Sequence, residues 1–303
     1  MFKNIKIFIN KIYNKLCSFL FILTKAKIVF GNPKISCDIL VFDDVSIEDL
    51  KFLLKGTNFF VLKSRVKNIT EIFISWKIIK LMFFYYEKSL LSSYLCAIIY
   101  LSKPKLLLTI IDNSLKFSEI AKIFHKEINV MAIQNARRFD IVPIKNKIFI
   151  PNFFCLGKYD IDFYKKYKIK VDKFYPVGSL RLANFLKKRS YLNPKVKFDI
   201  CYMADELKHD YEREIGVKNM RAGTIKLARY ILKFCLKNKF SLIIIFKDDS
   251  TKKSLMKLKK ISKKNFTDKE HEFFMKSLNK KRFVKNNSYK IIKSSKVVCG
   301  YAS

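Results

Sequence analysis

The sequence is poor in glycine, proline, histidine and acidic residues. Its 303 residues include only 7 Gly, 6 Pro and 3 His, while half of the chain is apolar. This composition excludes a collagen-like, low-complexity or disordered protein and supplies enough apolar residues for a buried core. The length suits two domains of ordinary size.

Closely spaced cysteines are also absent. The seven cysteines form no CxxC motif and stand at positions 17, 37, 96, 155, 201, 235 and 299. An odd, scattered set in apolar surroundings predicts buried, reduced thiols in a cytoplasmic protein. The three histidines are isolated, so no spacing suits zinc. We therefore expect no metal and no bound cofactor.

Acidic residues are few in comparison with basic ones. The chain has 25 Asp and Glu against 62 Lys and Arg, a formal net charge of +37. The abundance of Lys, Phe, Ile and Asn matches the coding bias of an AT-rich genome, but the acidic deficit does not follow from it. Such a charge attracts nucleic acid, anionic lipid or phosphorylated substrates. The lysine runs lack interleaved aromatic residues, which favours solvated faces over a nucleic-acid site.

The N-terminal region lacks a long apolar run. The segment Phe19–Leu23 is too short to span a bilayer, and Lys25 and Lys27 argue against a signal peptide. Apolar residues between positions 2 and 16 recur at helical spacing with lysines between them. This pattern suits a helix on an anionic membrane surface and equally a packed helix of the first domain. We treat residues 1–30 as a basic amphipathic segment.

From residue 31 onward, short apolar runs alternate with helical patterns. Strand patterns occupy residues 37–44, 58–63, 105–114 and 128–136, and helical patterns occupy 46–56, 70–102 and 117–126. Repeated strand-helix-strand units predict a parallel sheet with helices on both faces. Residues 31–190 should therefore form a first Rossmann-like domain.

Residues 191–303 repeat the alternation. Strands are expected at 198–205, at 240–249 and from 296 onward, helices at 224–238, 271–278 and 288–295, and a loop or exposed helix at 251–270. About 110 residues are fewer than the roughly 150 of a matching half, so we expect a C-terminally truncated domain. The predicted fold class is α/β, with two Rossmann-like domains facing each other across a cleft.

Polar residues follow the predicted strands, where open parallel sheets bind ligands. The positions are 43–44, 112–114, 134–138, 205–206, 248–249 and 300–303. Asp112 directly follows an apolar strand and precedes Asn113 and Ser114. Its carboxylate suits a general base that deprotonates an acceptor hydroxyl. Asp112 or Ser114 equally suits the N-cap of the following helix.

The next strand ends in an amide pair and two arginines. Gln134 and Asn135 are followed by Arg137 and Arg138, whose guanidinium groups suit phosphate or carboxylate ligands and equally surface ion pairs. Residues 160–162 have the form of a metal-binding DxD motif. Because FYKKYK follows, we interpret them as the start of a helix.

Several segments taken together resemble a known family. They are DILVFDD, KPKLLLTIIDNSLKF, INVMAIQNARR, FFCLGKYD, FYPVGSLRL, FDICYMAD and SSKVVCGYAS, in that order. The series resembles bacterial surface carbohydrate biosynthesis proteins, GT-B-type glycosyltransferases of capsule polysaccharide and lipopolysaccharide synthesis. The resemblance runs from about residue 31 to residue 303. It implies an N-terminal acceptor domain, a linker near VGSLR and a C-terminal domain that binds a nucleotide-activated donor.

The resemblance also implies roles for individual residues. Asp112 would be the catalytic base, and the acceptor would contact Asn113, Ser114, Gln134, Asn135 and Arg138. Gly300 and Ser303 would bind the donor, with Ser303 opening a turn that holds phosphate at a helix N-terminus. This chain has Ala136 where the family usually has glycine, which narrows the backbone conformations available.

The implied function is transfer of a sugar from a nucleotide-activated donor, a co-substrate, to a hydroxyl of a glycan or glycolipid. The enzyme would work in the cytoplasm, peripherally on the inner face of the plasma membrane, where its basic surface meets anionic lipid. Three alternatives stay open. They are a CDP-polyol phosphotransferase on the same fold, a non-catalytic nucleic-acid-binding protein with steep salt dependence, and a sugar-nucleotide epimerase.

Overall fold

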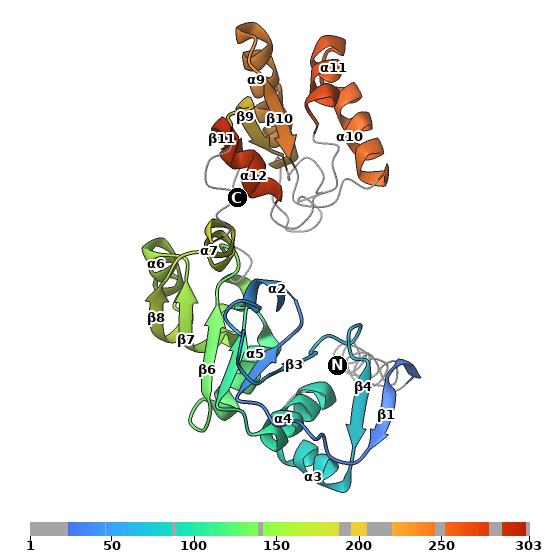
Figure 1. Ribbon diagram of the computed structural model, residues 1–303, viewed down its shortest axis with the longest axis vertical. Helices are drawn as coiled ribbons and strands as arrows, with labels where there is room; N and C mark the ends of the chain where they lie inside the picture. The colour runs from blue at the N-terminus through green and yellow to red at the C-terminus, as the bar shows by residue number, and fades with distance from the viewer. Residues whose placement is uncertain are drawn as a thin grey trace, which may run out of the picture. The chain divides into compact units, whose positions relative to one another are not determined.

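The chain forms two α/β units. The computed structural model describes residues 24–45, 47–86, 89–138, 142–187, 195–204, 220–245, 252–278 and 287–300. Unit 1 comprises Met1–Asn184 and unit 2 comprises Phe185–Ser303, whereas the sequence analysis placed the boundary after residue 190. Each unit contains a parallel sheet with helices packed on it, as in Rossmann-like folds (Figure 1).

Unit 1 is built on a six-stranded sheet in the order β3-β2-β5-β6-β7-β8, and every neighbouring pair is parallel. The strands are β2 (Ile39–Phe42), β3 (Phe59–Leu62), β5 (Leu106–Thr109), β6 (Asn129–Ile133), β7 (Phe149–Cys155) and β8 (Lys170–Pro176). After β3 the chain crosses to the other side of β2. The strand order therefore reverses between β2 and β5, and such a topological switch point is where open α/β sheets bind ligands.

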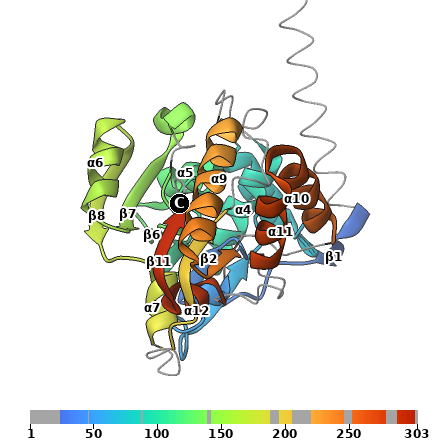
Figure 2. The same cartoon turned by 90° about the horizontal axis from the view of Figure 1, so that it is seen from above.

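Helices cover both faces of this sheet. They are α2 (Ile47–Leu50), α3 (Trp76–Phe84), α4 (Leu90–Ser102), α5 (Leu115–Phe124), the 3₁₀-helix η1 (Val142–Lys147), α6 (Lys158–Lys166) and α7 (Leu180–Leu186). Both views place α6 beside β7 and β8 (Figure 1 and Figure 2). Serine residues cap the N-termini of three of these helices. The side chains of Ser75, Ser89 and Ser114 each accept a backbone N–H bond at the start of α3, α4 and α5.

Alternation along the central strands explains the two cores. Leu40, Phe42 and Leu107 pack into the larger core with α4 and α5. Val41 and Leu108 point the other way and pack into a smaller core near α2 and α7. Successive strand residues face opposite sides of a sheet, so a strand that is apolar at every position is buried on both faces. The continuous apolar runs in the sequence predicted this arrangement correctly.

Two predictions for unit 1 were wrong in detail. Residues 70–102 do not form one helix. They begin with β4 (Glu71–Ile74), which pairs in parallel with β1 (Lys27–Phe30), and continue as α3 and α4. The pairing of β4 with β1 and the serine caps of α3 and α4 override the overall helical periodicity. The helix predicted at 46–56 is the single turn α2, followed by turns.

The sequence analysis also missed β7 and β8. Pro151 and Asn152 interrupt the apolar run of β7, and β8 is a mostly exposed edge strand that mixes lysines with aromatic residues. Neither segment looks like a buried parallel strand, because proline normally ends a strand pattern and an edge strand needs few apolar residues. Pairing with β6 supports β7, and β7 in turn supports β8.

Unit 2 contains a three-stranded parallel sheet in the order β10-β9-β11. Its elements are β9 (Phe198–Met203), α9 (Met220–Asn238), β10 (Leu242–Ile245), α10 (Lys252–Asn265), α11 (Asp268–Ser277), α12 (Asn287–Lys293) and β11 (Ser295–Gly300). The strands and α9 lie where the sequence predicted them, and residues 251–270 are mainly helical. The order repeats that of β3-β2-β5, so unit 2 has its own switch point between β9 and β11.

The burial predicted for the cysteines holds for most of those in the described part of the chain. Six cysteines lie in the described part of the chain, all are free thiols, and five are buried. Cys17 and the amphipathic pattern of residues 2–16 lie outside the described residues. Within the described ranges, no helix is both long enough and apolar enough to cross a membrane.

We expect packing in the larger core to contribute strongly to the stability of unit 1. Phe117 is fully buried and its ring lies 5.6 Å from that of Phe42. Phe117→Ala should lower the free energy of unfolding by about 3–5 kcal/mol, because it leaves a cavity between α5 and the sheet. Urea denaturation followed by circular dichroism measures the change. Phe83→Ala, which removes an exposed ring of the same type, should shift stability by less than about 0.5 kcal/mol. Equal effects of the two substitutions would contradict this account of the core.

Candidate functional site

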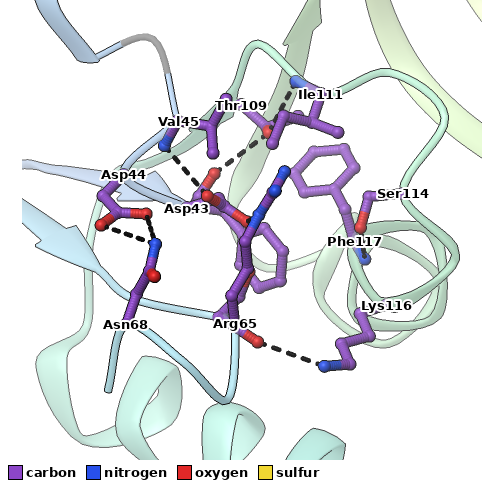
Figure 3. Close-up of polar contacts among 12 residues, drawn as sticks. Asp43, Asp44, Val45, Arg65, Asn68, Thr109, Ile111, Ser114, Lys116 and Phe117 are labelled. Carbon is purple, nitrogen blue, oxygen red and sulfur yellow. Dashed lines mark hydrogen bonds and ion pairs between the residues drawn. The ribbon is translucent and has the colours of Figure 1, made fainter. Parts of the chain in front are cut away.

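The polar residues of unit 1 gather at the carboxyl ends of its central strands. They form two groups. The switch-point cluster comprises Asp43, Ser64, Arg65 and Lys116, from the ends of β2 and β3 and the first turn of α5 (Figure 3). The arginine cluster comprises Asp112, Asn135, Arg138 and Tyr164, from the ends of β5 and β6 and from α6.

Asp43 ends β2 in an unusual backbone conformation. Its φ is 79°, in the left-handed region that side chains other than glycine seldom adopt. The backbone N–H of Asp43 still extends the pairing with β3 by donating to the carbonyl of Leu62 at 2.9 Å. The carboxylate accepts the N–H of Val45 at 3.0 Å, which stabilises the turn. Non-glycine residues held in this region occur preferentially at functional sites.

The carboxylate of Asp43 also binds two residues that follow β3. Its Oδ2 accepts a 2.8 Å hydrogen bond from the Ser64 hydroxyl and a 2.9 Å bond from Arg65 Nε. Burial alone raises the pKa of Asp43. The bonds from Val45, Arg65 and Ser64 and the charge of Arg65 outweigh burial and hold this pKa below its ordinary value. The side chain of Arg65 is half exposed, and among the described residues only its Nε has a protein acceptor.

Lys116 brings a second cation to the same strand ends. Its Nζ donates to the carbonyl of Ser64 at 3.2 Å (Figure 3). Burial lowers the pKa of Lys116, and the nearby carboxylates of Asp43 and Glu119 oppose that shift only in part. One buried carboxylate therefore faces a guanidinium and an amine. Within the four residues of the cluster the two cations outnumber the one carboxylate, with Glu119 near Lys116 as a further acid, and cations of these types suit an anionic ligand.

The arginine cluster is held together by the carboxylate of Asp112. Arg138 donates to both of its oxygens, from Nη2 at 2.7 Å and from Nε at 3.0 Å, and the Tyr164 hydroxyl donates at 2.9 Å. Arg138 Nη2 also donates to the side-chain oxygen of Asn135. Asp112 is completely buried. Burial, and then the charge of Asp112, raise the pKa of Tyr164, which keeps its proton available as a donor.

Gln134 links the end of β6 to β7 and α6. Its amide nitrogen donates to Asp160 at 2.7 Å and to the carbonyl of Ala136 at 3.1 Å, and its amide oxygen accepts the N–H of Leu156 at 2.9 Å. Gln134 and Asp160 are both buried. Asp160 lies in the first turn of α6, which confirms the interpretation of residues 160–162 as a helix start.

The other predicted residues have different surroundings. Ser114 caps α5 by accepting the N–H of Phe117 at 3.2 Å, so the capping interpretation is confirmed for this residue. Asn113 is half-buried in the turn before α5. Gly300 ends β11 beside Met203, and a Cβ at Gly300 would approach the Met203 Cβ to 3.1 Å. Packing therefore explains the glycine. Ser303 and residues 205–206 and 248–249 lie outside the described residues.

Sequence reasoning missed four members of the two clusters. Ser64 and Arg65 directly follow a predicted strand, so the rule that selected Asp112 could have found them. Lys116 had a weaker signal, as one lysine among many in the first turn of a helix. Tyr164 had none, because it comes from a helix 52 positions away from Asp112. Only the packing of α6 brings its hydroxyl to the carboxylate.

Two hollows lie within unit 1. One, at the strand ends, has a volume of about 10 Å³, enough for roughly one water molecule. It is lined by Asp49, Ile110, Gln134, Asn135, Ser179, Leu180 and Arg181. Arg181 donates to Asp49 at 2.8 Å beside it. The other, about 200 Å³, is mostly apolar and is lined by residues of β3, β4 and α4 but by no residue of either cluster.

Across the described ranges, no three His, Cys, Asp or Glu side chains gather as a metal site requires.

We expect the buried ion pair of the arginine cluster to control the stability of unit 1. Arg138→Met should lower the free energy of unfolding by about 3–5 kcal/mol, because it leaves the charge of Asp112 buried without a partner. Urea denaturation measures this. The matched control is Arg137→Met, whose exposed guanidinium lies 4.7 Å from the Tyr159 ring centroid and should contribute about 1 kcal/mol or less. Combining Arg138→Met with Asp112→Asn should recover part of the loss. If it deepens the loss instead, the ion pair is not the cause.

The pKa of Asp43 predicts an acid-sensitive contribution to stability. Because this pKa is lower in the folded chain than its usual value of about 3.9, the unfolded chain binds the proton more tightly. The contribution is therefore complete above about pH 4 and is lost as the pH falls towards the folded pKa. Arg65→Met should raise the pKa of Asp43 and weaken this pH dependence. Carboxyl ¹³C NMR titration measures the pKa, and Arg137→Met should leave it unchanged. An unaltered Asp43 titration in Arg65→Met would show that Arg65 does not hold the carboxylate.

No protein-family model matches the sequence, and no curated protein matches it. The structure establishes an α/β fold with parallel sheets in both units. The biochemical role is therefore argued from the switch points and from the residues that gather there.

Proposed function

We propose that this chain is a transferase of bacterial surface-carbohydrate synthesis. It moves a sugar from a nucleotide-activated donor to a hydroxyl of an anionic glycan or glycolipid, in the cytoplasm at the inner face of the plasma membrane. In this proposal unit 1 binds the acceptor and unit 2 binds the donor, as in GT-B enzymes. The observation that carries the proposal is the pair of cations, Arg65 and Lys116, held at the switch point of unit 1.

The switch-point cluster suits a phosphate or carboxylate of the acceptor. Arg65 is fixed through Nε by Asp43 and is half exposed, so its remaining N–H groups can form a bidentate pair with an anion. Lys116 supplies a second charge within the same cluster. Both cations are positioned before a ligand arrives, which reduces the entropy lost on binding. Strand ends at a switch point are the usual location of ligands in open α/β sheets.

The arginine cluster would orient the other end of the acceptor. Asp112 fixes Arg138, and Arg138 in turn fixes the side-chain oxygen of Asn135. In this arrangement Asp112 is a positioning residue. The sequence-based role of general base requires Arg138 to release the carboxylate, because Arg138 and Tyr164 hold both of its oxygens.

The proposed reaction is balanced without a further reactant. The acceptor hydroxyl forms a bond to the anomeric carbon of the donor sugar, and the bond from that carbon to the nucleotide phosphate breaks. The nucleotide leaves with the electron pair, and the hydroxyl proton passes to the carboxylate of Asp112 once Arg138 has released it. The strand order of unit 2 supports its assignment to the donor, since the switch point between β9 and β11 repeats that of unit 1.

A donor screen tests the proposal. The full chain is incubated with nucleoside-diphosphate sugars and bacterial glycolipid extract, and nucleotide release is measured. We expect release with one donor class. Arg65→Met should raise KM for an anionic acceptor by about tenfold or more and leave KM for the donor unchanged, since a charge-assisted pair contributes about 1.5–3 kcal/mol. Arg137→Met, also an arginine near the strand ends of unit 1, is the control and should leave both KM values unchanged.

Each contrary outcome has a separate meaning. Consumption of a CDP-polyol with transfer of polyol phosphate would replace the glycosyltransferase by the phosphotransferase on the same fold. Absence of turnover and of nucleotide binding, together with DNA binding that falls steeply with salt, would replace it by a nucleic-acid-binding protein. An equal rise of acceptor KM in Arg65→Met and Arg137→Met would remove the switch-point cluster from the acceptor site.

A further inference from the structure

Helix α3 carries large apolar side chains on its exposed side as well as on its buried side. Ile78 is buried, and Leu81, Met82 and Tyr85 pack against the larger core. The opposite side carries Trp76, Phe83 and Phe84, which are 72%, 80% and 80% exposed. Positions 76, 80, 83 and 84 follow the i, i+4, i+7, i+8 spacing of one helix face. Trp76, Phe83 and Phe84 therefore share one exposed face of α3, and Lys80 lies among them.

Strand β1 extends this exposed face beyond the helix. Phe30, at the end of β1, is 85% exposed and pairs in register with Ile74, two positions before Trp76. The hydroxyl of Ser75, the N-cap of α3, donates to the side-chain oxygen of Asn32 at 2.6 Å and ties the two segments together. Figure 1 shows β1 beside β4, and α3 follows β4 along the chain. We call Phe30, Trp76, Phe83, Phe84 and the exposed Tyr86 the aromatic face.

Lysines outnumber acidic residues around the aromatic face. The described residues of β1 and α3 include the exposed lysines Lys27, Lys77 and Lys80 and no acidic residue. Two acids stand nearby: Glu71 of β4 pairs in register with Lys27, and Glu87 follows Tyr86 in the sequence, so Lys77 and Lys80 of α3 carry the positive charge of this surface. Lysines beside exposed Trp and Phe side chains suit the boundary between lipid headgroups and acyl chains, where aromatic rings insert and cations meet anionic lipid.

We propose that the aromatic face docks unit 1 on an anionic bilayer. Exposed patches of large apolar side chains mark interaction sites, and the net charge of +37 selects a negatively charged partner. The adjacent rings of Phe83 and Phe84 favour a partner into which they can insert, and the acyl region of a bilayer accepts such rings. This inference rests on the proposed location at the membrane and is independent of the transferase activity.

The only tryptophan of the chain makes the proposal directly measurable. Trp76 is the single Trp, so all tryptophan emission reports the aromatic face. The full chain is mixed at low salt with phosphatidylcholine vesicles that contain or lack phosphatidylglycerol. We expect sedimentation and a blue shift of emission with the anionic vesicles only, and quenching by brominated acyl chains. Salt should weaken the binding.

Variants locate the docking surface. Phe83→Ser combined with Phe84→Ser should lower the partition coefficient for anionic vesicles by about tenfold or more, because two rings no longer leave water. The matched control is Tyr230→Ser with Phe234→Ser, which alters comparably exposed aromatic residues on α9 of unit 2, and it should bind as the unaltered chain does. Circular dichroism checks the folding of both.

Five results would overturn the inference. Equal vesicle binding by the two double variants, or sedimentation without a change in Trp76 emission, would place docking elsewhere in the chain. A dimer in solution that the Phe83 and Phe84 substitutions dissociate would identify the aromatic face as a contact between copies. A shift of the Trp76 emission maximum on addition of single-stranded DNA but not of vesicles would identify the aromatic face as a surface on which bases stack. Absence of vesicle binding by the unaltered chain would also refute the membrane location, but not the transferase activity.

Discussion

The carboxylate of Asp43 is the group on which the arrangement at the switch point depends. It stabilises the turn after β2 through Val45 and holds Ser64 and Arg65 at the end of β3. Lys116 joins the cluster by donating to the carbonyl of Ser64. The carboxylate of Asp43 thereby connects the ends of β2 and β3, and Ser64 connects them to α5, the helix that follows β5. A buried carboxylate without such partners would be strongly destabilising.

Asp112 applies the same principle at the next strand end. Both carboxylates are buried at carboxyl ends of parallel strands, and each is neutralised by an arginine from a different segment. The two arginines differ in exposure, since Arg65 is half exposed and Arg138 is almost entirely buried. This difference separates their proposed roles. Arg65 is accessible to an anion, whereas Arg138 orders the groups around it.

The proposed membrane surface uses a separate part of unit 1. The aromatic face belongs to β1 and α3, while the acceptor site belongs to the ends of the six-stranded sheet. Because α3 packs its other side on the larger core, a rigid element would connect a docked bilayer to the sheet. An anionic glycolipid acceptor then fits both proposals, since its lipid part stays in the bilayer and its headgroup carries the charge that the cations bind.

Local patterns in the sequence determined the α/β class, the parallel sheets and the position of Asp112 at a strand end, because each depends on hydrophobic periodicity and on strand-helix alternation. The tertiary structure alone decided the strand order, the existence of β7 and β8, and the partners of each carboxylate. Tyr164 and Asp112 meet only because α6 packs beside the sheet. The exposure of Trp76, Phe83 and Phe84 was likewise invisible in a sequence whose apolar residues usually mark a core.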